Sequence, residues 1–394
     1  MMRLSVATNF DNNLIDQISS YPVSDIYGKL SRDFIGGGRA SYSTQGISKS
    51  TLKSHIQYAH EKGIKFNYLM NTACLGNREW SSKGKRSIRK LLDMLSDFKV
   101  DSITVSTPYL AEIIKKRYPH FFLKVGIFAN IDSLERVRFW QDLGADMLTL
   151  ESFSVNRNFP LLKSIKKAAQ CQLQIITNFV CLSKCPMQIY HMNGLSHASN
   201  TQDKSAYIDY CVLKCSFSTL KDPELLIKSQ WIRPEDIDHY EKIGYSDFKL
   251  LERNAPTNVM VNRVKSYSNR TSPDNFMELI QPFGFKKETR KEIGWLIRNF
   301  FSYFMEQPLK VLNMRKLLKM RGMLYSLKEN PVFLDSKKIP SNFIDEISKR
   351  NCAVSGNCET CDYCQLISKK TYHIDNNYKE ECLALYEKVF EQLA

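Results

Sequence analysis

The sequence predicts an α/β protein: a closed (β/α)8, TIM-like barrel followed by a smaller, mostly helical, cysteine-rich domain. Apolar runs typical of strands alternate with helical patterns from the N-terminus onward, an order that builds a parallel sheet. Eight such runs occur, enough to close a barrel, and the alternation stops near residue 270. We therefore expect a barrel over 1–270 and a helical C-terminal domain over 271–394.

The eight predicted strands are short apolar segments, each followed by polar or turn residues. In chain order they cover 3–8, 23–29, 64–70, 102–106, 121–128, 146–151, 172–179 and 246–251. Helical patterns lie between most of them, at Thr51–Lys62, Ser87–Phe98, Pro108–Tyr118, Ser133–Leu143 and Phe159–Ala169. Gly63, Gly144 and Gly244 each stand between a helical run and a strand, where a left-handed helix terminus favours glycine.

In a barrel of this type the chemistry lies at the C-terminal ends of the strands. Polar residues follow several predicted strands there, among them Asn71, Asn130, Glu151 and Glu252. The connection between strands seven and eight, about 179–245, is far longer than the ~2–6 residues usual for such loops, which indicates a functional segment. Beyond 270, helical patterns at Lys287–Met305 and Leu309–Leu324 precede a second cysteine-rich stretch at 352–364.

Composition indicates a cytoplasmic protein that attracts anions. The N-terminus lacks the long apolar stretch of a signal peptide, and no segment reaches the roughly 20 apolar residues of a membrane span. The formal charge of +15 suits RNA or a phosphorylated or acidic small molecule, although a solvated basic surface explains it equally well. Eight of the eleven cysteines fall into two compact groups, and in a reducing compartment such groups favour metal ligation over disulfides.

The first cysteine group consists of two pairs, each spaced i, i+4, within the long connection. Cys181, Cys185, Cys211 and Cys215 are the predicted ligands of a four-iron four-sulfur cluster, since thiolates from strand-end loops can converge on it without a contiguous motif. Structural zinc is the main alternative, although its commoner spacing is Cys-x2-Cys, and unliganded buried thiols are the third.

The second group is Cys352, Cys358, Cys361 and Cys364, in which two-residue gaps separate the last three cysteines and five residues separate Cys352 from Cys358. This spacing fits a second cluster, and zinc would also fit. His191 and His197 lie between the two barrel pairs, and together with Glu151 they are candidate substrate-contacting or proton-transferring groups. The structural alternatives are backbone hydrogen bonds for the histidines and, for Glu151 and Glu252, salt bridges that close the barrel mouth.

The Asn71-Thr72 step, Glu151-Ser152, the cysteine segment and the stretch from Trp231 to Arg253 make residues 1–270 resemble the peptidase U32 family. The resemblance implies a barrel with a four-iron four-sulfur cluster on Cys181, Cys185, Cys211 and Cys215, and oxygen-independent hydroxylation of ubiquinone precursors or of RNA bases. Asn178-Phe179-Val180 replaces the glutamate-and-glycine signature that usually leads into the cysteines, which indicates a distinct branch.

We therefore expect an iron-sulfur hydroxylase or related redox enzyme acting on a small molecule or an RNA base, with a homologous subunit or an electron donor as its partner. One cluster would lie in the barrel and a second in the C-terminal domain, where it would relay electrons. A non-catalytic RNA- or protein-binding barrel stabilised by zinc is the alternative from another class. A peptidase, as the family name suggests, is the third, although no Ser-His-Asp set or HExxH motif is evident.

Overall fold

The computed structural model describes residues 2–41, 44–201, 209–282, 331–350, 352, 358, 360 to 393 and no others. Eight parallel strands form a closed barrel in which each strand pairs with the next along the chain and β1 closes onto β8. The strands are β1 (Arg3–Ala7), β2 (Val23–Gly28), β3 (Lys65–Met70), β4 (Ser102–Val105), β5 (Phe122–Val125), β6 (Met147–Thr149), β7 (Gln172–Ile176) and β8 (Asp247–Leu250). All eight predicted strands are confirmed, and so is the TIM-like fold.

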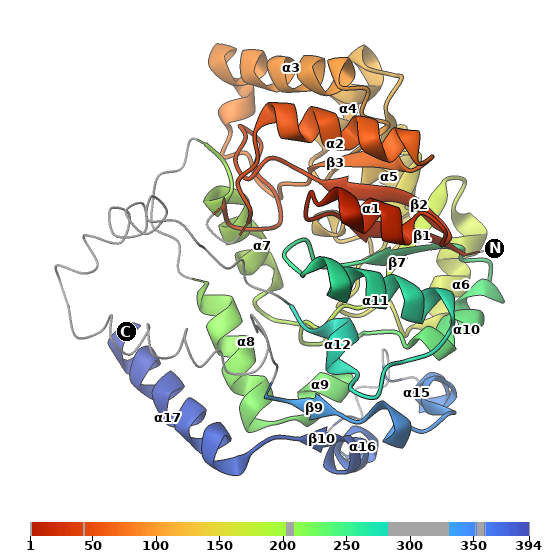
Figure 1. Cartoon of the computed structure of the whole chain (residues 1–394), viewed down its shortest axis with the longest axis vertical. Helices are drawn as coiled ribbons and strands as arrows, with labels where there is room; N and C mark the ends of the chain where they lie inside the picture. Colours follow the sequence, from red (N-terminus) through yellow and green to blue (C-terminus); the bar gives the residue numbers. More distant parts are fainter. Residues whose placement is uncertain are drawn as a thin grey trace.

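Helices surround the barrel and pack their apolar faces on it (Figure 1). They are α1 (Asn12–Ile18), α2 (Lys49–Glu61), α3 (Ser82–Asp97), α4 (Pro108–Arg117), α5 (Leu134–Asp142), α6 (Phe159–Ala168), α10 (Ile237–Glu241) and α11 (Thr257–Ser268). The five predicted helices are confirmed, but α3 begins five residues earlier than its pattern indicated. The hydroxyl of Ser81 caps it by accepting a hydrogen bond from the Gly84 N–H (3.0 Å), and the basic residues of its first turns hid this start.

Several strands end earlier than predicted because a tight turn follows them. β5 stops at Val125, where Ile127–Ala129 form a 3-10 turn that ends on Asn130 in the left-handed region (φ 51°). The three predicted glycines also adopt positive φ, at 74°, 85° and 91° for Gly63, Gly144 and Gly244. These turns set where the loops at the strand ends begin, and hence where the candidate site lies.

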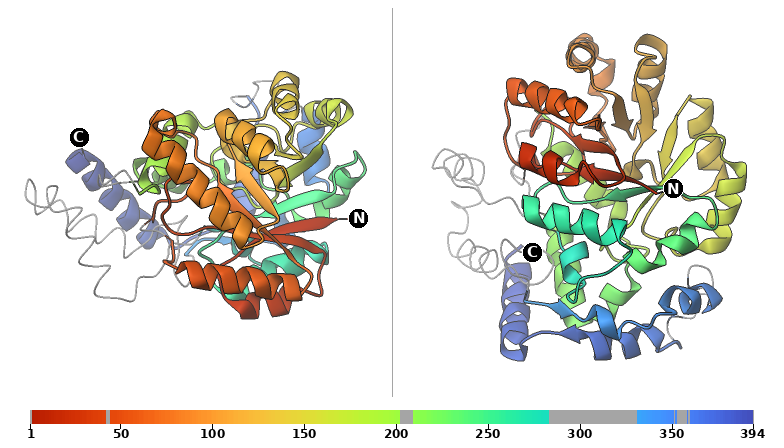
Figure 2. Two further views of the ribbon diagram at one scale, coloured as in Figure 1. Left: turned by 90° about the horizontal axis from the view of Figure 1, so that it is seen from above. Right: turned by 45° about the vertical axis from the view of Figure 1, so that its right-hand side comes forward.

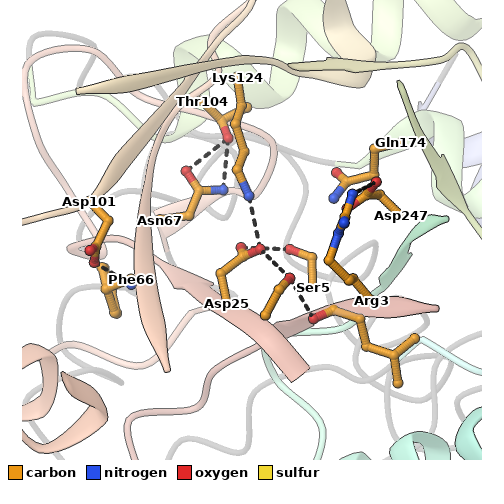
Figure 3. A network of polar contacts seen from close by, with 12 residues as sticks. Arg3, Ser5, Asp25, Phe66, Asn67, Asp101, Thr104, Lys124, Gln174 and Asp247 are labelled. Atoms are coloured by element: carbon orange, nitrogen blue, oxygen red, sulfur yellow. Dashed lines mark hydrogen bonds and ion pairs between the residues drawn. The ribbon is translucent and has the colours of Figure 1, made fainter. Parts of the chain in front are cut away.

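The interior of the barrel is polar, whereas barrels of this type are commonly filled by Val, Ile and Leu. Figure 3 shows Lys124 of β5 and Asp25 of β2 paired across it, with Nζ and Oδ1 2.9 Å apart, while the Ser5 hydroxyl donates to Asp25 (2.8 Å). Asn67 and Thr104 form a second buried pair at 2.9 Å. Burial of these groups is offset by their hydrogen bonds, so the barrel centre carries charge rather than a purely apolar core.

The long connection between β7 and β8 contains α7 (Gln188–Ala198), α8 (Tyr210–Lys221) and α9 (Glu224–Lys228). After α12 (Met277–Ile280), the C-terminal elements are an antiparallel pair, β9 (Phe333–Leu334) with β10 (Tyr372–His373), and helices α15 (Phe343–Arg350), α16 (Tyr363–Thr371) and α17 (Asn376–Leu393). They gather to one side of the barrel, as Figure 1 and Figure 2 show.

The C-terminal part is therefore a helical region that carries cysteines, as predicted. The two helices expected at Lys287–Met305 and Leu309–Leu324 fall outside the described residues. The boundary expected near residue 270 stays a prediction. Within the described part of the chain, no helix combines the length and apolar character needed to cross a bilayer.

Candidate functional site

The first cysteine pair lies on the loop that leaves β7 at the strand-end face. Cys181 and Cys185 pack against a small apolar cluster of Phe153, Ile176, Phe179 and Met192, which is separate from the main core. The loop is held by its backbone: the Lys184 N–H donates to the Phe153 carbonyl (2.9 Å), with Lys184 in the left-handed region at φ 49°. These contacts hold the loop in place without using either thiol.

The second pair lies on α8, where Cys211 and Cys215 are one turn apart and therefore share a helix face. Asp209 caps this helix, since its Oδ1 accepts a hydrogen bond from the Val212 N–H (3.1 Å). Cys211 is buried and Cys215 is half-buried. The cap explains why a helix begins at Tyr210 and presents both thiols in the same direction.

The structure brings the two pairs together. Cys215 is electrostatically coupled to Cys181, Cys185 and Cys211, and Cys181 is coupled to Cys185. Burial raises the pKa of Cys181 to about 12 and that of Cys211 to about 11, and it also raises the pKa of Cys185 and Cys215. The carboxylate of Asp209 adds to the rise at Cys181, Cys211 and Cys215. Without a positively charged group to bind them, these sulfurs stay protonated.

A pocket of about 330 Å³ opens beside Cys185 of the first cysteine pair. Its wall includes Cys185, Glu151, Arg136 and Gln188. Glu151, which follows β6, is almost fully buried, and its carboxylate accepts hydrogen bonds from the Phe153 N–H (2.6 Å) and from the Ser154 N–H (2.9 Å). Burial raises the pKa of Glu151, although these bonds oppose the rise. Glu151 thus holds the turn that carries Phe153, rather than forming the salt bridge considered from the sequence.

The two candidate histidines lie on α7 but point in different directions. His191 Nε2 is 3.0 Å from Asp209 Oδ1, although the angle does not make a hydrogen bond between them. Because Asp209 also acts on three of the thiols, His191 belongs to the cysteine site. His197 follows six residues later, which rotates it about 240° around the helix axis from His191. Both histidines are half-buried.

The glycine-rich loop after β2 packs directly onto α7. A Cβ at Gly36 would lie 2.5 Å from the Ser196 carbonyl oxygen, and the Gly37 N–H donates to the Ser199 hydroxyl (2.6 Å). The backbone of this loop therefore approaches α7 more closely than a residue with a Cβ would allow. Next to them, Arg39 forms an ion pair with the buried Glu252, which is the barrel-mouth salt bridge expected from the sequence.

The last helix, α17, packs against the helix that carries the second cysteine pair. Phe217 of α8 contacts Phe390 edge-on with ring centroids 5.5 Å apart, and it contacts Tyr386 at 5.9 Å. Lys214 lies over the Phe390 ring at 3.7 Å, an arrangement that adds a cation–π attraction. The figures place the two helices side by side (Figure 1), so α17 supports the position of Cys211 and Cys215.

The C-terminal cysteines also lie close together, but positively charged side chains surround them. Cys352 is coupled to Cys358 and Cys361, and Cys364 to Cys352 and Cys358. Burial raises the pKa of Cys364 to about 11. Three cations surround this group: Arg157 acts on Cys352 and Cys364, Lys228 acts on Cys358 and Cys364, and Arg350 Nη1 is 4.0 Å from the Cys361 sulfur.

Arg157 connects the barrel to this second cysteine group. Its guanidinium donates to the carbonyls of Trp231 (2.7 Å) and Ile227 (2.9 Å) and stacks on Trp231 and Phe343 at 4.3 and 5.0 Å. Burial lowers the pKa of Arg157 to about 10. The side chain remains charged at neutral pH and lies between the two parts of the molecule.

The donor sets fit a metal-thiolate centre in chemical terms. Each group supplies four sulfur atoms, the ligand number of a four-iron cluster and of structural zinc. Within the described residues, no three His, Cys, Asp or Glu side chains already surround a single point as ligands of one ion. Iron or zinc would supply the positive charge that the buried sulfurs of the barrel group lack.

Sequence reasoning missed two groups of residues at this face. Asp209 was not singled out, although an aspartate directly before a helical segment signals an N-cap. Lys124 and Lys249 were not singled out either, although a lysine in the middle of an apolar strand signals a charged group inside the barrel. Both signals are readable once the strand positions are known.

Comparisons with known proteins concern the family and the fold of the chain. The model of peptidase family U32 matches residues 34–267. An uncharacterized protease of Methanocaldococcus jannaschii is 34% identical over 249 residues, which are 63% of this chain and 73% of that protein. The tRNA hydroxylation protein P of Haemophilus influenzae is 27% identical over 122 residues, 30% of this chain and only 25% of that protein.

A solved structure of a U32 peptidase has a similar fold. The match has a TM-score of 0.51 at 20% identity and covers 65% of this chain and 94% of that structure. At this identity the likeness concerns the fold alone. The C-terminal cysteine group lies beyond the matched family region.

Proposed function

The chain belongs to peptidase family U32, and from that premise we propose that it is an iron-sulfur enzyme. In this proposal Cys181, Cys185, Cys211 and Cys215 hold a four-iron four-sulfur cluster. The reaction is an oxygen-independent hydroxylation, or a related redox modification, of a small molecule or an RNA base. The observation that carries the proposal is the mutual coupling of these four thiols next to a pocket at the strand-end face.

When bound, the cluster would supply a Lewis-acidic or one-electron centre at the pocket wall. The protein residues around it have separate tasks. Glu151 keeps the Phe153 turn closed, and Phe153 covers Cys181 and Cys185 on the apolar side. Arg136 and Gln188 offer hydrogen-bond donors to a ligand in the pocket. His191, next to Asp209, can hold or release a proton close to the thiols.

The class of substrate is supported by two observations. One relative carries the name tRNA hydroxylation protein P, and the net charge of +15 favours anionic partners such as RNA. An electron donor or a homologous subunit is the expected partner, because a redox step at the cluster needs a source or acceptor of electrons. The proposed location is the cytoplasm, where thiols stay reduced.

We also propose that Cys352, Cys358, Cys361 and Cys364 hold a second metal centre, either iron-sulfur or zinc. The three cations around this group favour a thiolate centre with net negative charge, whichever metal it holds. If the centre contains iron, its place beside Arg157 suits an electron relay toward the barrel.

A peptidase is the second candidate, because one relative is named a protease. A cysteine peptidase needs a thiol whose pKa is lowered by a neighbouring cation, since the thiolate is the nucleophile. The pocket thiol Cys185 has a raised pKa instead. The site therefore favours metal ligation over nucleophilic attack.

The test is metal analysis of the full chain purified without oxygen. Two clusters predict about eight iron and eight sulfide per chain, one barrel cluster predicts about four of each, and two zinc centres predict about two zinc and a colourless protein. The variant Cys215→Ala should lose the barrel iron. The control Cys171→Ala, at a half-buried cysteine that precedes β7, should retain it.

The C-terminal variant Cys364→Ala should lose only the second metal. Zinc in the barrel group, or iron that survives Cys215→Ala, would refute the cluster proposal. Peptide cleavage that persists in Cys215→Ala and Cys185→Ala would support the peptidase instead.

A further inference from the structure

The solvent side of α3 is positively charged over its N-terminal half. The basic row there consists of five exposed side chains, Lys83, Lys85, Arg86, Arg89 and Lys90. The helix contains no acidic residue before position 93. Among the residues that the structure describes, no carboxylate forms an ion pair with any member of the basic row.

The basic row destabilises the helix that carries it. The N-terminus of a helix has a partial positive charge, so cations in the first turns are unfavourable there. Arg86 and Lys90, and likewise Lys85 and Arg89, also stand four residues apart, where like charges repel each other. The five cations therefore do not serve the stability of α3, whereas a bound polyanion would remove both penalties.

The spacing of the basic row suits an extended polyanion. Lys83, Arg86 and Lys90 recur at i, i+3 and i+7, so they lie within about 60° of one another around the axis and span about 10 Å along it. Lys85 and Arg89 lie on one side of this stripe. A chain of phosphates can contact the stripe at several points, which a single small ion cannot.

An exposed aromatic side chain stands directly before the basic row. Trp80 ends the 3-10 turn η2 (Arg78–Trp80) and is 55% exposed. Its ring centroid is 4.4 Å from that of Tyr109, the second residue of α4, which is half-buried and supports the indole from one side. A large ring is thus fixed by a neighbour and still presents more than half of its area to solvent.

The position of Trp80 relative to the basic row is also fixed. The Ser81 hydroxyl, which caps α3, donates to the Arg78 carbonyl (2.8 Å). A Cβ at Gly84 would lie only 1.9 Å from the same carbonyl oxygen, so η2 packs on the first turn of α3 as closely as glycine alone permits. The aromatic ring and the cations therefore form one preorganised surface.

This surface lies at the same end of the barrel as the pocket. η2 is on the loop that leaves β3, and Tyr109 is at the start of the helix that follows β4. The pocket residues Asn130 and Glu151 follow β5 and β6. Loops after parallel strands share one face of a barrel, so a partner that binds along α3 lies on the face into which the pocket opens.

We infer that Trp80 and the basic row of α3 form a docking surface for a single-stranded segment of RNA. One base stacks on Trp80, and the phosphates that follow it contact the basic row. An aromatic ring beside a row of cations is the combination that sites for single-stranded nucleic acid use. The choice of RNA rests on the proposed function, of which this inference selects the RNA form, but the surface itself requires no cluster.

A membrane surface fits these residues less well. A helix that lies on a membrane buries its apolar face among the lipids. The apolar face of α3, which includes Ile88, Leu92 and Leu95, is instead packed in the core against the barrel. Trp80 is then the one large apolar side chain that this surface offers to a bilayer, among the residues described.

The test is fluorescence anisotropy of a labelled, unstructured RNA oligonucleotide titrated with the full chain at several salt concentrations. Trp80→Ala should weaken binding about tenfold and leave the salt dependence unchanged, because base stacking involves no counterion release. The triple variant Lys83→Gln, Arg86→Gln and Lys90→Gln should reduce the slope of log affinity against log salt by about 2, since each phosphate contact with a single strand contributes ~0.7.

Matched controls keep the change in side chain and charge but move it elsewhere. Phe139→Ala removes an aromatic ring on α5 that is 49% exposed, and a second triple variant replaces the exposed Lys116, Arg117 and Lys163 by Gln. Both controls should bind RNA like the wild type. Equal weakening by the two triple variants, or wild-type binding by Trp80→Ala, would overturn the inference.

The same titration with vesicles of phosphatidylglycerol and phosphatidylcholine in equal parts examines the membrane. Vesicles should bind more weakly than RNA. Tighter binding to vesicles than to RNA, lost in Trp80→Ala, would overturn the inference in favour of a membrane surface.

A further measurement uses the wild type alone and guards against misfolded variants. RNA should slow acetylation of Lys83 and Lys90, followed by mass spectrometry, while Lys163 on α6 reacts at an unchanged rate. Equal protection of all three lysines, or of none, would likewise refute the surface. Metal content enters none of these readouts, so failure here leaves the cluster proposal standing with a small-molecule substrate, and failure of the cluster leaves this surface standing.

Discussion

Replacing Lys249 by Met should stabilise the ligand-free protein, and the gain should depend on pH. Lys249 is faced by Lys124 on β5, by Asp25 and Tyr27 on β2, and by Arg253 beyond β8. Burial, reinforced by the charge of Lys124, lowers the pKa of Lys249 from 10.5 to about 7. The folded protein therefore binds this proton more weakly than the unfolded chain does.

The size of the effect follows from that shift. At about 1.4 kcal/mol per pKa unit, keeping Lys249 protonated costs the folded state on the order of 5 kcal/mol below pH 7. The cost shrinks as the pH rises from about 7 toward 10.5 and vanishes above that value, because the unfolded chain then also loses the proton. Methionine has a similar shape but no charge, so Lys249→Met removes this cost at every pH.

The assay is urea denaturation of the wild type and Lys249→Met without oxygen, in a buffer without phosphate or other dianions. The free energy of unfolding of the variant should exceed that of the wild type by several kcal/mol near pH 6, and by about 1 to 2 kcal/mol near pH 9.5. A packing change from the new side chain adds the same amount at both values. A difference between the two proteins that is equal at both pH values, or larger at the higher one, would refute the reasoning. Lys116→Met on the exposed face of α4 should show no difference at either pH.

Three further outcomes follow from the contacts of the site. Phe390→Ala in α17 removes the ring that packs on Phe217, so thermal unfolding should show a loss of about 2 kcal/mol, and the barrel metal should fall while the C-terminal metal stays. Glu252→Gln leaves Arg39 without its carboxylate, so urea denaturation should show a free energy of unfolding about 3 kcal/mol lower than that of the wild type. Glu151→Ala frees the N–H groups of Phe153 and Ser154, so unfolding should be easier by about 2 kcal/mol, and faster hydrogen exchange should be confined to that turn; an unchanged exchange rate there would show that Glu151 does not hold it.

The barrel was predictable because its elements depend on local patterns. The backbone conformation of a strand, a helix or a glycine turn depends on residues close by in the sequence. The predicted strands and helices, and the turns at residues 63, 144 and 244, were therefore found where expected. The strand-end position of the first cysteine pair followed from the same patterns, since loops after parallel strands share one face.

Contacts between distant segments were not predictable in this way. The ion pair of Arg39 and Glu252 joins residues 213 positions apart, so the sequence did not identify Arg39 as the partner of Glu252. The packing of α17 on α8 depends on surfaces that no local pattern describes. The charges inside the barrel were missed for a related reason. A single lysine in an apolar strand resembles an exposed position until the register shows that Lys124 meets Asp25.

The packing of α17 on α8 also bears on the order in which the molecule is completed. A ribosome makes the chain from its N-terminus. All eight strands and the four candidate sulfur ligands of the barrel therefore emerge well before Tyr386 and Phe390. The helix that presents Cys211 and Cys215 acquires its aromatic neighbours only when residues 376 to 393 have been synthesised and have folded back. If the barrel holds the proposed metal centre, its insertion therefore belongs to the end of biosynthesis, and a chain that terminates before this helix should retain the metal poorly.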